Sequence, residues 1–171
     1  MFFPLLLQSL YFFLPAYLAN MAPVLLRWLP GSVPIHEHWF GGNKTWRGLV
    51  VAVLVGGFVF WLQKYAYALG FRQWTLIDYN DFSILMGFLL GAGAILGDLF
   101  KSFWKRRYGI SPGERWIPWD QLDFVMGGIV FSFFLYVPPV EVVVVLLVIS
   151  PLLHVMVNHI GYWVGIRKEK W

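Results

Sequence analysis

Five long runs of apolar residues dominate the pattern of the chain, and short polar segments separate them. The runs cover residues 5–26, 49–69, 83–103, 122–137 and 140–164. A helix needs about 20 mostly apolar residues to cross a bilayer. Pro138 and Pro139 divide the last two runs into an antiparallel hairpin, because neither residue can continue the preceding helix. The pattern predicts an all-α, polytopic membrane protein with about five transmembrane helices, forming a single domain over residues 1–171.

The composition supports a membrane location and excludes several kinds of chemistry. The chain is 59% hydrophobic and 13% charged, whereas soluble domains average roughly 25% charged residues. A surface exposed to water could not be covered by so few charges, so a soluble enzyme is excluded. The chain has no cysteine, which excludes disulfides, cysteine-based zinc sites and thiol nucleophiles. Any metal would need oxygen or imidazole ligands.

The positions of the basic residues predict the orientation in the membrane. Lys64 and Arg72 lie on one predicted side, and the other 11 of the 13 lysines and arginines lie on the opposite side. Cytoplasmic loops carry an excess of these residues. We therefore expect an outer N-terminus, a cytoplasmic C-terminus and a site that faces the cytoplasm. The first run has no basic residue before it, which favours a retained helix over a cleaved signal peptide.

Glycines at spacings of four recur in the third run, and a pair follows in the fourth run. Small residues at this spacing let helix backbones approach closely in lipid. We therefore assign a packing role to Gly87, Gly91, Gly93, Gly97, Gly127 and Gly128.

The first predicted cytoplasmic loop ends in the sequence Gly-Gly-Asn-Lys-Thr-Trp-Arg-Gly over residues 41–48. Glycines allow backbone amides to approach an anion, the start of the next helix attracts negative charge, and Lys44 and Arg47 add full charges. The segment lacks the glycine spacing of a P-loop. Both a phosphate cradle and an ordinary helix start beside lipid head groups fit this pattern.

The second predicted cytoplasmic loop brings acids and bases together. If the third helix continues past the apolar run, Asp98, Lys101 and Lys105 share one of its faces, and Asp120 and Asp123 share a face of the fourth helix. An ordinary cytoplasmic loop with helix-capping acids would explain the basic residues. It explains Asp98 poorly, because an unpaired carboxylate at the end of an apolar helix is energetically unfavourable. Three carboxylates beside basic residues suit Mg²⁺ and phosphate oxygens, as phosphoryl or nucleotidyl transfer requires.

Three polar residues in the last run have two possible roles. His154 and Asn158 lie one helical turn apart, followed by His159. They could contact a substrate head group, but hydrogen bonding between helices is the commoner explanation and is favoured here. His36 and His38, which flank a glutamate in the first loop, form a weak metal signal.

Several of these motifs resemble a known enzyme family. Ser102-x-x-Lys105-Arg106 followed by Pro118-x-Asp120-x-x-Asp123 resembles a shortened signature of the CTP-dependent phosphatidate cytidylyltransferases. Gln121 replaces the arginine of that signature, and its Lys-Asp and His-Gly-Gly elements are absent. The archaeal branch, the CDP-archaeol synthases, is more similar along almost the whole chain. The matching stretches are 17–25, 34–35, 42–48, 97–98, 102–107, 120–124 and 151–158, with Asn43 at a position where glycine is usual.

The resemblance implies transfer of CMP from CTP to the phosphate of 2,3-bis-O-geranylgeranyl-sn-glycerol 1-phosphate, an isoprenoid ether lipid, with release of pyrophosphate. It also implies dependence on Mg²⁺ and action on membrane lipids at the cytoplasmic face. The expected catalytic residues are Asp98, Lys101, Lys105, Asp120 and Asp123, and the three aspartates are the expected metal ligands. The expected residues for CTP or lipid phosphates are Asn20, Asn43, Lys44, Thr45, Arg47, Ser102, Arg106 and Gln121. The oligomeric state stays open.

Other functions fit the sequence less well. A CDP-alcohol phosphotransferase would carry an Asp-Gly-x-x-Ala-Arg motif, which is missing. A transporter would place polar residues along a path near the midplane and often has repeated halves, whereas the charges here concentrate at one predicted surface. Nucleic-acid binding is not expected, because the basic residues follow the membrane topology and no recognition module accompanies them.

Overall fold

The computed structural model describes residues 2–111 and 114–165, and all regular elements in this part of the chain are helices. They are α1 (Phe2–Leu25), α2 (Glu37–Phe40), α3 (Trp46–Ala68), α4 (Leu85–Arg107), α5 (Trp119–Ser132) and α6 (Val140–Trp163). A single antiparallel bridge between Pro34 and Thr45 is the one β-type contact within these residues. The predicted all-α fold is confirmed.

Four of the described helices, α1, α3, α4 and α6, are long and apolar enough to cross a membrane. The predicted run 122–137 differs from the helix that forms there, because α5 begins earlier, at Trp119, and ends at Ser132. Its 14 residues span about 21 Å at 1.5 Å per residue, less than the roughly 30 Å of a bilayer core. The chain is a multi-pass membrane protein, while the fifth crossing stays a prediction.

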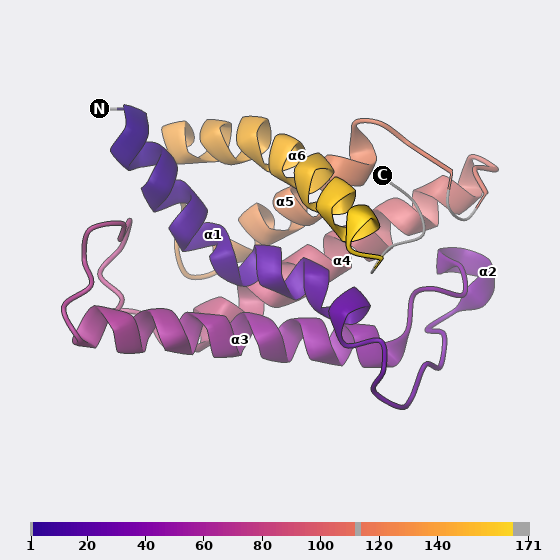
Figure 1. Cartoon of the computed structure of the whole chain (residues 1–171), viewed down its shortest axis with the longest axis horizontal. Coiled ribbons are helices and arrows are strands. Elements are labelled where there is room, and N and C mark those ends of the chain that lie inside the picture. Colours follow the sequence, from indigo (N-terminus) through magenta and orange to yellow (C-terminus); the bar gives the residue numbers. More distant parts are fainter. Residues whose placement is uncertain (1, 112–113, 166–171) are drawn as a thin grey trace.

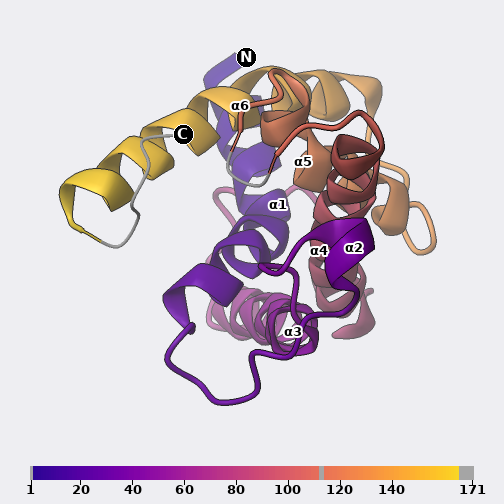
Figure 2. The ribbon, with the colours of Figure 1, turned by 90° about the vertical axis from the view of Figure 1, so that its right-hand side faces the viewer.

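Helix α4 is the centre of the arrangement and packs against α3, α5 and α1. In Figure 1, α3 runs along one side of the molecule, α1 crosses obliquely above it, and α6 lies on the opposite side. Figure 2 shows that α6 leans away from the other helices toward its C-terminal end. Phe12, Phe13, Phe60, Leu90 and Phe124 are buried in the core between these helices.

Glycines set the close approach of α4 to its two main neighbours, as the sequence predicts. A Cβ atom on Gly56 of α3 would stand 2.5 Å from the carbonyl oxygen of Gly87 in α4. On the other side of α4, a Cβ atom on Gly93 would meet the carbonyl oxygen of Gly127 in α5. Larger residues would force these helix backbones apart. The packing role of the glycines is confirmed, and α3 contributes a glycine that the sequence pattern did not single out.

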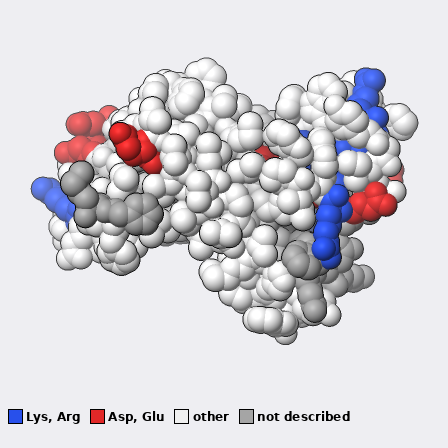
Figure 3. Space-filling view, turned by 90° about the horizontal axis from the view of Figure 1, so that it is seen from above, with Lys and Arg blue, Asp and Glu red and all other residues white. Residues whose placement is uncertain are grey.

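Charged side chains gather toward the two ends of the long axis, and the middle of the face seen in Figure 3 is largely uncharged. Exposed apolar residues cover the helices between the two ends, among them Leu54, Phe58, Val130, Val144 and Val148. In water such a surface would be unfavourable, but lipid tails cover it without cost. The distribution agrees with a bundle whose middle lies in a bilayer.

Candidate active site

A polar cavity of about 390 Å³ lies at one end of the bundle, where α1, α3, α4, α5, α6 and both predicted cytoplasmic loops meet. Most of the residues predicted from the sequence as site residues line it. These are Asn20, Asn43, Lys44, Thr45, Asp98, Lys101, Lys105, Asp120, Gln121 and Asp123. The fold therefore brings together residues that lie up to about a hundred positions apart in the chain.

The C-terminal part of α4 supplies the charges at the centre of the cavity. The helix continues beyond the apolar run to Arg107, so Asp98, Lys101 and Lys105 share a face as predicted. The Lys101 ammonium lies 3.2 Å from Asp98 Oδ1, 2.9 Å from Asp120 Oδ1 and 2.9 Å from Asp123 Oδ2. One lysine thus pairs with all three predicted acids, one from its own helix and two from α5.

Two further lysines complete the charge balance of the cluster. Lys44, from the first loop, forms an ion pair with Asp98 Oδ2. Lys105 lies 3.1 Å and 3.0 Å from the two carboxylate oxygens of Asp120 and also donates to the carbonyl oxygen of Glu114. Three carboxylates therefore face three ammonium groups, and the cluster has no net charge when all six are ionised.

The Asp120 carboxylate is held in its charged form. Burial opposes ionisation, but the Lys101 ammonium, the backbone N–H of Trp116 and Lys105 lower the pKa of Asp120 below its ordinary value of 3.8. The Trp116 N–H donates to Asp120 Oδ2 at 2.6 Å. Asp120 also lies in the first turn of α5, where the helix dipole favours a negative charge.

The glycine contact between α4 and α5 positions the acids. A Cβ atom on Gly97, the residue before Asp98, would collide with the carbonyl oxygen of Asp123 and would lie 3.2 Å from the Cα of Gly127. The absence of a side chain at residue 97 therefore lets α5 approach close enough for Asp123 to reach Lys101. Packing and site geometry depend here on the same residue.

The first loop is held by backbone hydrogen bonds that present Lys44 to the cavity. The Ile35 N–H donates to the Lys44 carbonyl oxygen at 2.8 Å, and the Thr45 hydroxyl oxygen accepts from the Gly48 N–H at 3.1 Å, which caps α3. Gly41 has a φ of 85°, where glycine is favoured. Asn43 does not adopt a positive φ, because in the described parts of the chain only glycines do.

Three residues predicted for substrate binding do not line the cavity. The Arg47 guanidinium donates to the carbonyl oxygen of Arg27 at 3.0 Å and to that of Leu29, so it ties the start of α3 to the segment that follows α1. Ser102 is buried on α4. Arg106 is partly buried, and its Nε atom has no hydrogen-bond partner among the described residues. The substrate-binding roles of these three residues stay predictions.

The cavity also includes residues that sequence reasoning did not assign to it. His154 and Asn158 of α6 line it, together with Glu114 and Arg115 from the second loop. His154 packs against the ring of Phe124 at 5.6 Å between centroids, while the favoured hydrogen bonding between helices stays a prediction. The spacing of one turn between His154 and Asn158 was the signal that could have identified both.

The carboxylates stand at distances suited to an ammonium group. Oxygens lie 2.9–3.2 Å from Lys101 Nζ, whereas Mg²⁺ binds oxygen at about 2.0–2.1 Å. Within residues 2–111 and 114–165, no group of three or more acidic or imidazole side chains has the spacing of a metal site. The donor set nevertheless fits a hard cation, because it consists of carboxylate oxygens and a spare amide oxygen on Gln121.

Comparison with known proteins identifies the family. The family described as "CarS-like: CDP-archaeol synthase" matches residues 2–171. The chain belongs to the CDP-archaeol synthase family. A CDP-archaeol synthase of Methanospirillum hungatei is 37% identical over 172 residues, which cover 92% of this chain and 99% of that protein. One from Methanococcus maripaludis strain C7 is 35% identical and covers 98% and 97% of the two chains.

A more distant relative matches the full length of the chain, and a solved structure matches its fold. The synthase of Methanocaldococcus jannaschii is 30% identical over all of both chains. A solved structure described as "Structural insight into an intramembrane enzyme for archaeal membrane lipids biosynthesis" superposes with a TM-score of 0.70 at 29% identity, covering 88% of this chain and 92% of that one. The resemblance seen in the motifs is confirmed, and the chain is an enzyme, a CTP-dependent nucleotidyltransferase.

Proposed function

We propose that the chain transfers CMP from CTP to the phosphate of 2,3-bis-O-geranylgeranyl-sn-glycerol 1-phosphate, giving CDP-archaeol and pyrophosphate. The observation that carries this proposal is a polar, charge-dense cavity that opens onto two apolar grooves. A nucleotide and a lipid phosphate need such a combination. The reaction joins a water-soluble substrate to a membrane-bound one.

The charged cluster suits an in-line displacement at the α-phosphorus of CTP. An oxygen of the lipid phosphate attacks that phosphorus, and the bond to the bridging oxygen of the pyrophosphate breaks. The nucleophile is already an anion, so no strong general base is needed. Lys44, Lys101 and Lys105 stabilise the triphosphate and the negative charge that develops on the departing pyrophosphate.

The acids have a separate task in this scheme. Asp98, Asp120 and Asp123 would hold Mg²⁺, which neutralises charge on phosphate oxygens when it is bound. They also orient the lysines through the ion pairs described above. Positioning of the two phosphates then supplies most of the rate enhancement.

The first apolar groove supports binding of a hydrocarbon chain. It lies between α4 and α5, has a volume of about 760 Å³ and is lined by residues that include Leu96, Phe100 and Val130. Lys101 and Asp123 border both this groove and the polar cavity. A lipid whose phosphate lies near Lys101 can therefore extend a chain into the groove and toward the bilayer.

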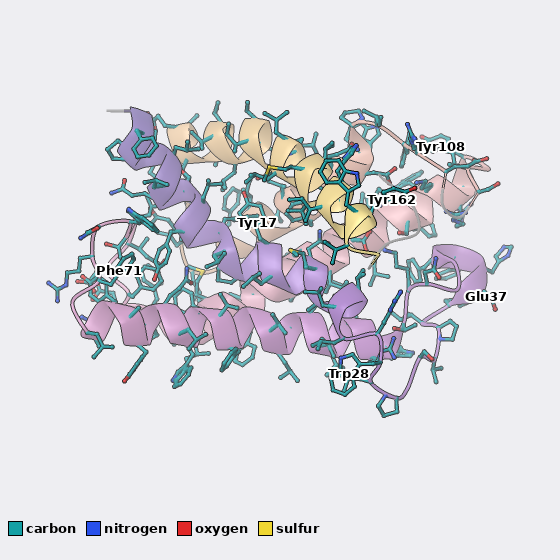
Figure 4. All side chains as sticks on the ribbon, viewed as in Figure 1. Tyr17, Trp28, Glu37, Phe71, Tyr108 and Tyr162 are labelled. Atoms are coloured by element: carbon teal, nitrogen blue, oxygen red, sulfur yellow. The ribbon has the colours of Figure 1, made fainter. Side chains whose placement is uncertain are left out.

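A second apolar groove lies between α1 and α6 and has a volume of about 410 Å³. Asn20, His154 and Asn158 border both this groove and the polar cavity. Toward its C-terminal end α6 leans away from the other helices (Figure 2), and Asn158 is the one residue of α6 beyond Ser150 that is buried. Figure 4 shows the ring of Tyr17 between the two helices, where its hydroxyl shares a hydrogen bond of 2.6 Å with Ser150. Two grooves on different helix pairs suit a lipid with two chains.

The charge distribution supports a cytoplasmic location for this end of the bundle. Lys44, Lys101, Lys105 and Arg115 line the cavity, whereas Lys64 and Arg72 belong to the opposite end of α3 and the loop after it. By the positive-inside rule, an excess of lysine and arginine near the cavity supports a cytoplasmic location for it.

Pyrophosphate release tests this function. Purified protein receives CTP and Mg²⁺ with the geranylgeranyl ether-lipid phosphate, with ordinary phosphatidic acid, or without lipid. We expect release that requires CTP, Mg²⁺ and the ether-lipid phosphate. No release with any lipid, from protein shown to be folded, would contradict the proposed reaction, and equal rates with both lipids would contradict the specificity for the ether lipid.

A further inference from the structure

The three acids of the cavity divide their oxygens in the same way. Each presents one oxygen to Lys101, as the distances above describe. The other oxygen of each has a different donor: Lys44 for Asp98, Lys105 and the Trp116 N–H for Asp120, and the Phe124 N–H for Asp123, at 2.6 Å. The second donors fix the orientation of each carboxylate. Each acid therefore keeps a donor when Lys101 moves away.

A buried oxygen without a partner belongs to a residue that lines the same cavity. Gln121 is 9% exposed, lines the same cavity, and sits in α5 between the two aspartates of that helix. Its Oε1 atom has no hydrogen-bond partner among the described residues. An unpaired buried carbonyl oxygen is costly, and an amide oxygen is a ligand that hard cations accept. This observation is independent of the acids and also indicates a cation.

We propose that the Lys101 ammonium and a divalent cation compete for one position between Asp98, Asp120 and Asp123. In the nucleotide-free chain, the ammonium occupies that position and neutralises the acids. When a divalent cation binds there, the ammonium leaves and becomes available to the phosphates of the nucleotide. The proposal concerns how the charged cluster accepts its cation, so it deepens the proposed function and rests on its use of Mg²⁺.

The exchange follows from size and charge. A cation bound to all three acids needs oxygens about 1 Å closer than they stand around the ammonium, so both cannot occupy the same point. The ammonium sits on a flexible four-carbon stem and can move away without displacing α4. Once it has left the acids, the ammonium needs another anion beside it, and a triphosphate provides one. Free divalent cations should therefore bind weakly unless a nucleotide arrives with them.

A titration of Mn²⁺ without CTP or lipid tests this competition. Mn²⁺ prefers the same oxygen ligands as Mg²⁺, and its electron paramagnetic resonance signal reports the free ion. We expect Lys101→Met to bind Mn²⁺ at least tenfold more tightly than the wild-type chain, although it removes a residue of the site. Lys101→Gln, which keeps donors for the acids and lacks the charge, should show the same gain if Lys101→Met does not fold.

Lys105→Met is the matched control, because it removes the same charge from the same helix but from a lysine that pairs with Asp120 alone among the acids. We expect a gain below about threefold from it. Adding Asp123→Asn to Lys101→Met should abolish the gain. No gain from Lys101→Met and Lys101→Gln, or an equal gain from Lys105→Met, would overturn the proposal. The titration needs no turnover, so a failed pyrophosphate assay with a clear Mn²⁺ gain would contradict only the proposed reaction.

Discussion

Replacement of Asp98 by asparagine separates the charge of this residue from its volume. The carboxylate pairs with Lys44 through one oxygen and with Lys101 through the other. Asp98→Asn keeps the shape of the side chain, so it leaves no cavity, but it removes the charge that holds both lysines. The loss of these charged hydrogen bonds should cost about 1–3 kcal/mol of stability. Since Lys101 keeps two other acids, the fold should survive.

The effect on turnover should be much larger than the effect on folding. Removal of one preorganised electrostatic group from a catalytic site typically lowers kcat about 10²–10³-fold, equivalent to roughly 2.7–4 kcal/mol. We expect a loss of this size for Asp98→Asn in pyrophosphate release, measured on protein that elutes as a single peak in detergent. Asp81→Asn, at an exposed acid near the opposite end of the bundle, should change kcat less than about twofold. Wild-type turnover by folded Asp98→Asn would remove this residue from the mechanism.

Three further predictions concern the grooves, the packing and the pH dependence. Val130→Trp fills the groove between α4 and α5 and should raise the KM for the long-chain lipid about tenfold, or about 1.4 kcal/mol, with the KM for CTP unchanged. Phe133→Trp, outside the groove, should leave both KM values unchanged. If the two variants raised the KM for the lipid equally, the groove would not be the binding site of the lipid chain. Gly97→Ala should lower kcat more than Gly91→Ala does, because the added methyl group at residue 97 pushes α5 away from Lys101. A larger loss of kcat from Gly91→Ala would refute the dependence of the site geometry on this helix contact. The lowered pKa of Asp120 gives stability above its ordinary pKa that is lost as pH falls through the lowered value. Asp120→Asn should therefore lower the melting temperature at neutral pH and have little effect in strong acid, and a constant difference would contradict this.

The sequence predicted the helices well where the apolar runs are long. The prediction was poorest for the bounds of α5. The run from Phe133 to Val137 is as apolar as a membrane helix, so hydropathy alone extends the element past Ser132. In the structure, the Ser132 hydroxyl donates to the Ile129 carbonyl oxygen and turns follow. At the other end, α5 begins at Trp119, before the apolar run, so Asp120 lies on this helix as its spacing from Asp123 predicts.

The members of the site were predictable from residue type, but their convergence was not. Asp98, Asp120 and Asp123 are unusual next to apolar runs, which is a signal in the sequence itself. That all three meet one lysine depends on how closely α4 and α5 cross, and Gly97 sets that distance through a contact with a residue in another helix. For His154 and Asn158, contacts between helices were favoured because these are the commoner explanation for polar residues in a membrane helix. Their place in the cavity depends on the angle at which α6 leans from α1.

The fate of the α-phosphate of CTP tests the central claim most directly. CTP carrying a label in either the α- or the γ-phosphate is incubated with the chain, Mg²⁺ and the ether-lipid phosphate, and the lipids are then extracted into organic solvent. Transfer of CMP predicts that the α-label enters the lipid fraction while the γ-label stays in the aqueous phase as pyrophosphate. A γ-label in the lipid fraction, or an α-label found only in free CMP, would contradict the assignment of this cavity to cytidylyl transfer.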